Sequence, residues 1–139
     1  MNVLFDNCTS PVLATTLDGF IQSSGHRAYH IANVPGLLKG RATPDLEWID
    51  HLRQSPRDWI FVSGDGRVLK NSAERAALRS AGLHGFILAP AYQKTPLNQL
   101  AATLVWKWPE IQKVTELLSP PSMHEIPVGR MKKLRPLPL

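Results

Sequence analysis

Several features are scarce or missing in this 139-residue chain, and each absence removes a class of protein. The single cysteine, Cys8, leaves no disulfide framework and no cysteine-based zinc site. No apolar run approaches the roughly 18 residues that a membrane-spanning helix needs, so we expect no membrane partner. The first residues contain no basic segment and soon reach Asp6, which argues against a secretory signal. We therefore expect a cytoplasmic protein.

Common catalytic and nucleotide-binding motifs are absent as well. The chain has no G-x-G-x-x-G, Walker A or nucleophile-elbow sequence, and Ser63-Gly64 lacks the strand-turn-helix pattern of such an elbow. The five histidines are scattered and have no metal-ligand spacing. These absences count against a nucleotide-binding protein and against a serine hydrolase.

What the chain does have is a surplus of positive charge. The formal net charge is +5 and 43% of the residues are hydrophobic, which is typical of a globular protein with one core. A basic protein of this kind favours a polyanionic partner, and nucleic acid is the most common one.

Apolar runs and helix signals alternate along the chain. Strands are predicted at 3–5, 28–32, 59–62 and 85–89. Ser10-Pro11 and Thr43-Pro44 each predict a helix start, and a capping box from Asn71 to Glu74 opens a helix that ends near Gly82. A long amphipathic stripe covers 97–118, and Pro109 is expected to break or restart that helix. This order predicts a single three-layer α/β domain with a central, mostly parallel sheet.

The composition shifts at Ser119, which divides the chain into a domain at 1–118 and a basic, proline-rich C-terminal extension at 119–139. We expect this extension to be partly extended and to add an edge strand at about 123–128. Its candidate partners are RNA, a second protein, a second copy of the chain, or simply the domain itself.

Three carboxylates are expected to meet at one edge of the sheet. Asp6 ends the first predicted strand, Asp65 ends the third, and Asp45 lies in the first turn of the helix after the second. The carboxyl ends of parallel strands share one edge, where α/β sheets bind ligands. Close carboxylates repel one another, and a divalent cation removes that cost; oxygen ligands suit Mg²⁺ or Mn²⁺. Such a site could hydrolyse a phosphodiester.

Secondary candidates surround these three catalytic and metal-binding aspartates. Additional candidate ligands are Glu47, Asn71 and Glu74, and candidate phosphate- or RNA-binding residues are Lys39, Arg67 and Lys70. Most of these residues also have a structural explanation. Asp6 and Asp65 could be plain turn residues, and the helix dipole alone favours Asp45. Glu47 could be solvated surface, Arg67 and Lys70 a solvated turn, and Asn71 and Glu74 are part of the capping box. Gly64 and Gly66 are interpreted as giving substrate and metal close access to Asp65.

The order of these motifs resembles that of the PIN-like nucleases, and is most similar to the branch of VapC-type toxins with a compact PIN-like domain. The motifs are Phe5-Asp6-Asn7 with Ser10-Pro11, Ala42-Thr-Pro-Asp45-Leu-Glu47-Trp48-Ile49, Phe61-Val-Ser-Gly-Asp65, and Asn71-Ser-Ala-Glu74-Arg75. The resemblance spans residues 2–118. It implies a Mg²⁺-dependent ribonuclease, the toxin of a toxin–antitoxin pair, restrained by a cognate antitoxin protein and often dimeric.

In that pattern Asp6 matches the first acidic position, Asp45 or Glu47 the second, and Asp65 the third. The fourth has no clear aspartate, and Asn71 or Glu74 is nearest. Two other functions stay open. A non-catalytic binding module would keep the fold without the chemistry. A phosphoacceptor receiver domain would need a second carboxylate beside Asp6, where Asn7 stands.

Overall fold

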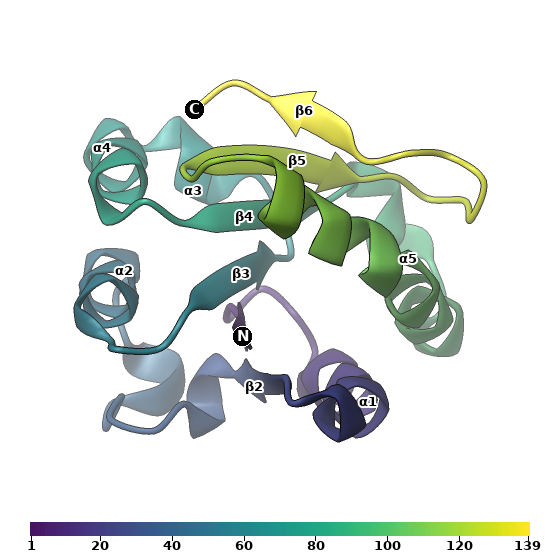
Figure 1. Cartoon of the computed structure of the whole chain (residues 1–139), viewed down its shortest axis with the longest axis horizontal. Helices are drawn as coiled ribbons and strands as arrows, with labels where there is room; N and C mark the ends of the chain where they lie inside the picture. The colour runs from purple at the N-terminus through teal and green to yellow at the C-terminus, as the bar shows by residue number, and fades with distance from the viewer.

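Six strands form one sheet at the centre of the molecule, in the order β2-β1-β3-β4-β5-β6 (Figure 1). The computed structural model describes all 139 residues. The strands are β1 (Asn2–Phe5), β2 (Arg27–His30), β3 (Trp59–Ser63), β4 (His84–Leu88), β5 (Ser122–Ile126) and β6 (Arg135–Leu137). The first five are parallel, and only β6 runs antiparallel to its neighbour. The predicted single α/β domain with a mostly parallel sheet is confirmed.

Helices cover both faces of the sheet, which gives the expected three layers (Figure 1). They are α1 (Pro11–Ile21), α2 (Asp45–Gln54), α3 (Arg67–Lys70), α4 (Ser72–Ala81) and α5 (Leu97–Leu117), with short 3₁₀ turns between them. Val3 and Phe5 of β1 face the core under α1 and α5, whereas Leu4 faces the core under α2 and α4. Because both faces of β1 are covered, its sequence is continuously apolar rather than alternating.

The predicted helix starts are present, with one difference of detail. The hydroxyl of Ser10 accepts the Val12 amide at the start of α1, with Pro11 in the first turn. At the second start the cap position is Pro44, and the Thr43 hydroxyl donates instead to the Gly40 carbonyl. Pro11 is thus the first residue of α1, whereas Pro44 is the residue that precedes α2.

Pro109 does not break the long helix, so that expectation was wrong: α5 runs without interruption through it. A proline inside a helix costs about 3 kcal/mol because it removes a backbone donor and crowds the preceding turn. Leu104, Trp108 and Ile111, which flank the proline, are all at most 3% exposed. Their burial against the sheet on both sides of Pro109 offsets the cost and holds the helix in one piece.

The C-terminal extension belongs to the same sheet as the rest of the chain. A strand forms where one was expected, but β5 lies between β4 and β6 rather than at the edge. Met123 and Ile126 of β5 are at most 2% exposed and join the two opposite cores. Residues 119–139 therefore complete the domain, and the edge is the three-residue β6.

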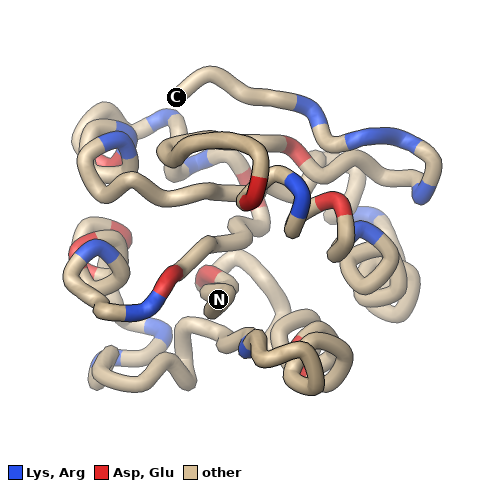
Figure 2. The backbone as a smooth tube through the Cα atoms, viewed as in Figure 1, with Lys and Arg blue, Asp and Glu red and all other residues tan.

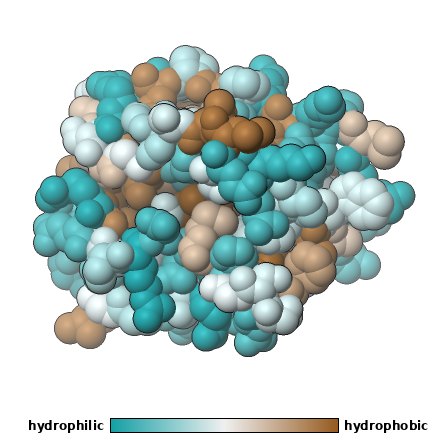
Figure 3. Space-filling view, viewed as in Figure 1, coloured by the Kyte–Doolittle hydropathy of each residue, from teal (hydrophilic) through white to brown (hydrophobic).

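None of the helices combines the length and the hydropathy that a membrane span requires. The face seen in Figure 3 is largely hydrophilic, with apolar side chains in separate patches.

Candidate functional site

The ends of β1 and β3 form the floor of a cavity of about 470 Å³ at the carboxyl edge of the sheet. The two strands are paired in register, with Phe5 beside Val62, so Asp6 and Ser63 emerge side by side. The N-terminal turns of α2 and α4 supply Asp45 and Glu74 to the same cavity. Its lining residues are Asp6, Asn7, Cys8, Thr43, Pro44, Asp45, Ser63, Asp65, Arg67, Val68, Asn71 and Glu74. The predicted convergence of Asp6, Asp45 and Asp65 on one edge is thus present.

Asp6 is the most deeply placed of these carboxyl groups, with 5% of its surface exposed. Its Oδ1 accepts the backbone amides of Cys8 and Gly64, each at 3.1 Å, and its Oδ2 lies 2.5 Å from the Ser63 hydroxyl. Burial raises the pKa of Asp6 to about 6, the charge of Asp45 adds to the rise, and the hydrogen bonds only partly oppose it. Asp6 therefore changes charge within the range of ordinary pH.

The contacts of Ser63 are consistent with a proton on Asp6. The hydroxyl oxygen of Ser63 lies within hydrogen-bonding distance of both Asp6 Oδ2 (2.5 Å) and the Asp65 carbonyl (2.8 Å). One hydroxyl has one hydrogen and cannot donate to both acceptors. Protonated Asp6 would donate to Ser63, which would then donate to the carbonyl, so all three groups would be satisfied.

Asp45 and Glu74 form a second acidic contact in the cavity. Burial raises the pKa of Glu74, and the charge of Asp45 and a hydrogen bond between the two carboxyl groups raise it further. Asp45 is held from the other side, where Trp48 Nε1 donates to its Oδ1 at 2.8 Å. Asp6, Asp45 and Glu74 thus form one electrostatically coupled set, which we call the acidic cluster.

The capping box that explained Glu74 from sequence is only half formed. Asn71 Oδ1 accepts the Glu74 amide at 3.0 Å, as expected. The side chain of Glu74 does not return to the Asn71 backbone but faces Asp45 across the cavity. The sequence allowed Glu74 to be a site residue or part of the helix cap, and it could not decide between the two roles.

Asp65 reaches the cavity but is bound to a cation of the protein itself. Its Oδ2 accepts Arg67 Nε at 2.7 Å and its Oδ1 accepts the Arg67 amide at 2.9 Å. Burial would raise the pKa of Asp65, but these bonds and the charge of Arg67 outweigh it and lower the pKa. Arg67 also reaches the sulfur of Cys8, 3.0 Å from its Nη2. Asp65 is therefore ionised and paired, unlike Asp6.

Three other predicted residues lie outside the cavity lining. Lys39 and Glu47 form an exposed ion pair with each other, at 2.9 Å between Nζ and Oε2. Lys70 is exposed at the end of α3 and is not part of the lining, whereas Arg67 and Asn71 are.

Gly64 has a different purpose from the one predicted. A Cβ atom there would lie 2.3 Å from the carbonyl oxygen of Cys8, so the glycine permits the chain after β1 to cross the end of β3. This contact is what places the Gly64 amide on Asp6. A Cβ atom at Gly66 would meet nothing within 4 Å. Gly64 is therefore explained by backbone packing, whereas at Gly66 the interpretation as access to Asp65 stays a prediction.

The acidic cluster has the right donors for a hard divalent cation, since all its ligands are carboxylate oxygens. Burial is the main cause of the raised pKa values of Asp6 and Glu74, and the charge of Asp45 adds to both, so a bound cation would favour the ionised form of each group. In this arrangement, however, no group of three His, Cys, Asp or Glu side chains surrounds a common point. Metal binding would therefore require the carboxylates to close in, and Asp45 and Glu74 to exchange their mutual hydrogen bond for the metal.

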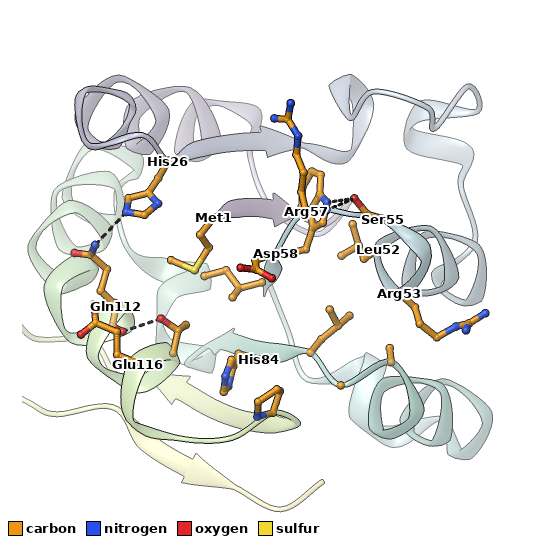
Figure 4. Close-up of a pocket in the computed structure, with 17 residues that line it drawn as sticks. Met1, His26, Leu52, Arg53, Ser55, Arg57, Asp58, His84, Gln112 and Glu116 are labelled. Atoms are coloured by element: carbon orange, nitrogen blue, oxygen red, sulfur yellow. Dashed lines mark hydrogen bonds between the residues drawn. The ribbon is translucent and has the colours of Figure 1, made fainter.

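A larger cavity, of about 610 Å³, opens at the opposite edge of the sheet (Figure 4). His26 and Gln112 meet on one side of it, at 3.3 Å between nitrogens. Arg53 and Arg57 extend away from its centre (Figure 4). None of the predicted site residues lines it, and its charged groups do not converge, so the smaller cavity is the candidate site.

One comparison with known proteins gives a match. The family model described as PIN like domain matches residues 1–90, which include the whole acidic cluster. No curated protein and no solved structure matches the chain.

Proposed function

The chain belongs to the PIN-like domain family, and from this premise we propose that it is a divalent-metal-dependent nuclease that hydrolyses RNA. PIN-like domains are commonly nucleases, and the basic charge of this protein suits a polyanionic substrate. The choice of RNA rather than DNA as the substrate rests on the sequence resemblance.

One observation carries the proposal: carboxylates from three distant segments meet in one cavity and are coupled. Asp6, Asp45 and Glu74 are separated by dozens of residues in the chain, yet the charge of Asp45 raises the pKa of both others. The raised pKa values of Asp6 and Glu74 mean that their charged forms are destabilised at this site, even though Asp6 is hydrogen-bonded to Cys8, Ser63 and Gly64. Perturbed groups gathered in a cleft are typical of functional sites.

We assign Asp6 and Asp45 as the principal metal ligands and Glu74 as the third. When bound, Mg²⁺ or Mn²⁺ would polarise a phosphoryl oxygen, make a water nucleophilic and neutralise the leaving oxygen. Arg67 lies at the cavity mouth, 75% exposed, and its planar donors suit a phosphate. A phosphate on Arg67 would release Asp65 toward the metal, so Asp65 would join the site only with substrate present.

Cleavage of a mixed RNA pool, with Mg²⁺ or with EDTA, tests this assignment. The variants are Asp6→Asn, Asp45→Asn and Glu74→Gln, each of which keeps the side-chain shape and removes a charge. The control is Asp50→Asn, because Asp50 lies on α2 like Asp45 but is exposed and paired with Arg53. We expect metal-dependent cleavage by the wild type and the control, and loss of at least a hundredfold in Asp6→Asn and Asp45→Asn.

Cleavage in EDTA, or an active Asp6→Asn protein, would refute the metal nuclease. Asp65→Asn separates the two candidates for the third ligand. Strong loss in Asp65→Asn with an active Glu74→Gln protein would replace Glu74 by Asp65 in the assignment.

A second candidate function is a binding module that does no chemistry. The observation that favours it is the ion pair between Asp65 and Arg67, which fills the position where the resemblance expects a free carboxylate. A well-folded wild type that binds RNA, cleaves none, and gains no melting temperature from Mg²⁺ or Mn²⁺ would establish this candidate.

We further propose, on the sequence resemblance, that the nuclease acts as a toxin restrained by a cognate antitoxin and that it dimerises. Induced expression in a bacterial host should then arrest growth, and Asp6→Asn should abolish the arrest. Equal growth with both proteins, at equal folded levels, would exclude the toxin role without touching the nuclease activity.

A further inference from the structure

The segment between β5 and β6 forms a basic arm, which we define as residues 127–134. Arg130, Lys132 and Lys133 are exposed, and none of them has an acidic partner. The arm contains no aspartate or glutamate. Figure 2 shows its positive residues gathered along the outer loop that precedes β6. The arm lies beyond the part of the chain that matches the family, so it is a feature of this chain's own C-terminal region.

A buried lysine holds the arm in a fixed position. Lys107 of α5 is 2% exposed, and its ammonium donates to the backbone carbonyls of Arg130 and Lys132. Glu110 pairs with this ammonium at 3.6 Å and accepts the Leu134 amide at 2.8 Å. Burying an ammonium group is costly unless all its partners are supplied. The protein thus fixes the backbone of the arm while its charged side chains stay in solvent.

An aromatic ring stands beside these charges. Trp106, next to Lys107 on α5, is 55% exposed. The Arg130 guanidinium lies 4.8 Å from the centre of its ring. The guanidinium lies over the ring, so one face of the indole carries a cation–π contact while the side chain as a whole stays about half exposed. Exposed aromatic and guanidinium planes of this kind are surfaces on which unstacked nucleic-acid bases stack, while neighbouring cations hold the phosphates. Bases in a duplex are already stacked and cannot use such a face.

The arm starts at the same edge of the sheet as the acidic cluster. β5 runs parallel to β1 and β3, so Ile126 ends at the edge where Asp6 and Ser63 end. In the sheet order β5 is three strands away from β1, whose end carries Asp6, and this corresponds to about 14 Å between the strands. A single flexible strand of nucleic acid can therefore extend from the cavity across this edge to the arm.

We propose that the basic arm and Trp106 form a binding surface for single-stranded RNA that holds the substrate beside the acidic cluster. Arg130, Lys132 and Lys133 bind phosphates, and Trp106 stacks on a base. The assignment of this strand as the substrate rests on the proposed nuclease function, whereas the binding itself does not.

The test measures binding without cleavage, using the full chain in EDTA and a labelled single-stranded RNA of about 12 nucleotides, within common site sizes. Affinity is followed by fluorescence anisotropy as salt is raised. In the triple variant Arg130→Ala, Lys132→Ala, Lys133→Ala, the slope of log affinity against log salt should fall by about 2, at about 0.7 per lost phosphate contact. Trp106→Ala should weaken binding about fivefold or more, and Trp106→Tyr should restore most of it.

The matched control is Arg53→Ala, Arg57→Ala, Arg79→Ala, which removes three positive charges from outside the arm. This control should keep a slope close to that of the wild type. A slope that falls equally in both triple variants would overturn the proposal, because it would reflect net charge alone. Equal affinity for duplex RNA, or a Trp106→Ala protein that binds as the wild type does, would overturn the single-strand assignment.

Two further outcomes separate this proposal from its alternatives. If Trp106→Ala changes only the oligomeric state by size-exclusion chromatography, the surface is a protein contact and the proposal fails. If the wild type binds RNA through the arm but never cleaves it with Mg²⁺, the nuclease function fails and the binding surface stands. If it cleaves RNA and the arm variants bind and cleave as well as the wild type, the arm proposal alone fails.

Discussion

Asp6→Asn is expected to stabilise the metal-free protein, although it removes the most buried carboxylate of the site. The pKa of Asp6 is about 6 in the folded protein against an ordinary 3.8, so its ionisation costs the folded state about 3 kcal/mol relative to the unfolded chain. Well below pH 3.8 the group is protonated in both states and this cost is absent. Stability is lost as pH rises from about 4 to about 6, and the loss stays constant above that.

Asparagine reproduces the protonated form of Asp6. Its carbonyl can accept the amides of Cys8 and Gly64, and its NH₂ group can donate to Ser63, which is free to donate to the Asp65 carbonyl. The free energy of unfolding of Asp6→Asn should therefore exceed that of the wild type by up to about 3 kcal/mol at pH 8. In melting temperature this is on the order of 10 °C for a domain of this size.

The assay is thermal unfolding by circular dichroism from pH 4 to pH 8, in EDTA, with Asp50→Asn as the control for loss of an exposed charge. The difference between Asp6→Asn and the wild type should open between pH 4 and pH 6. Addition of Mg²⁺ should then reduce this stability difference at pH 8, because an ion that binds only the wild-type site stabilises only the wild-type protein. An Asp6→Asn protein less stable than the wild type at pH 8 would refute the desolvation argument.

Three other changes have definite expected results. Gly64→Ala should lower the free energy of unfolding, measured by urea denaturation, by about 1 to 3 kcal/mol, because its Cβ would press on a backbone carbonyl. Gly66→Ala, with open space around it, should be near neutral, and equal effects of the two substitutions would contradict the packing role of Gly64. Arg67→Ala should raise the pKa of Asp65 toward its ordinary value in a carboxyl NMR titration. It should change stability by less than about 1 kcal/mol, since the Arg67 side chain is 75% exposed; an unmoved pKa would show that the pair does not exist in solution. Lys107→Met should destabilise the protein by about 1 to 3 kcal/mol, since it leaves two backbone carbonyls of the arm without a donor. It should also speed tryptic cleavage within the arm, and an unchanged cleavage rate would mean that Lys107 does not hold the arm in place.

The layout of the fold could be predicted from the sequence because its signals are local. Continuous apolar runs such as 59–62 indicated buried strands, and Ser10 and Asn71 marked helix starts. Right-handed crossovers then put the strand ends on one edge, so that Asp6, Asp45 and Asp65 could be assigned to one site without coordinates. Pro109 was misjudged because the packing of its neighbours against the sheet overrides a local rule.

The partners of each side chain could not be predicted, because they depend on contacts between distant segments. Whether Glu74 turns back to its cap or forward to Asp45 depends on how closely α4 approaches α2. Whether Asp65 is free or paired depends on the turn that brings Arg67 back to it. The sequence by itself determined that Asp6, Asp45 and Asp65 reach one edge of the sheet, since strand direction follows from the order of elements. Only the tertiary structure decided which of them repel one another, because charge interactions depend on separation and burial rather than on position in the chain.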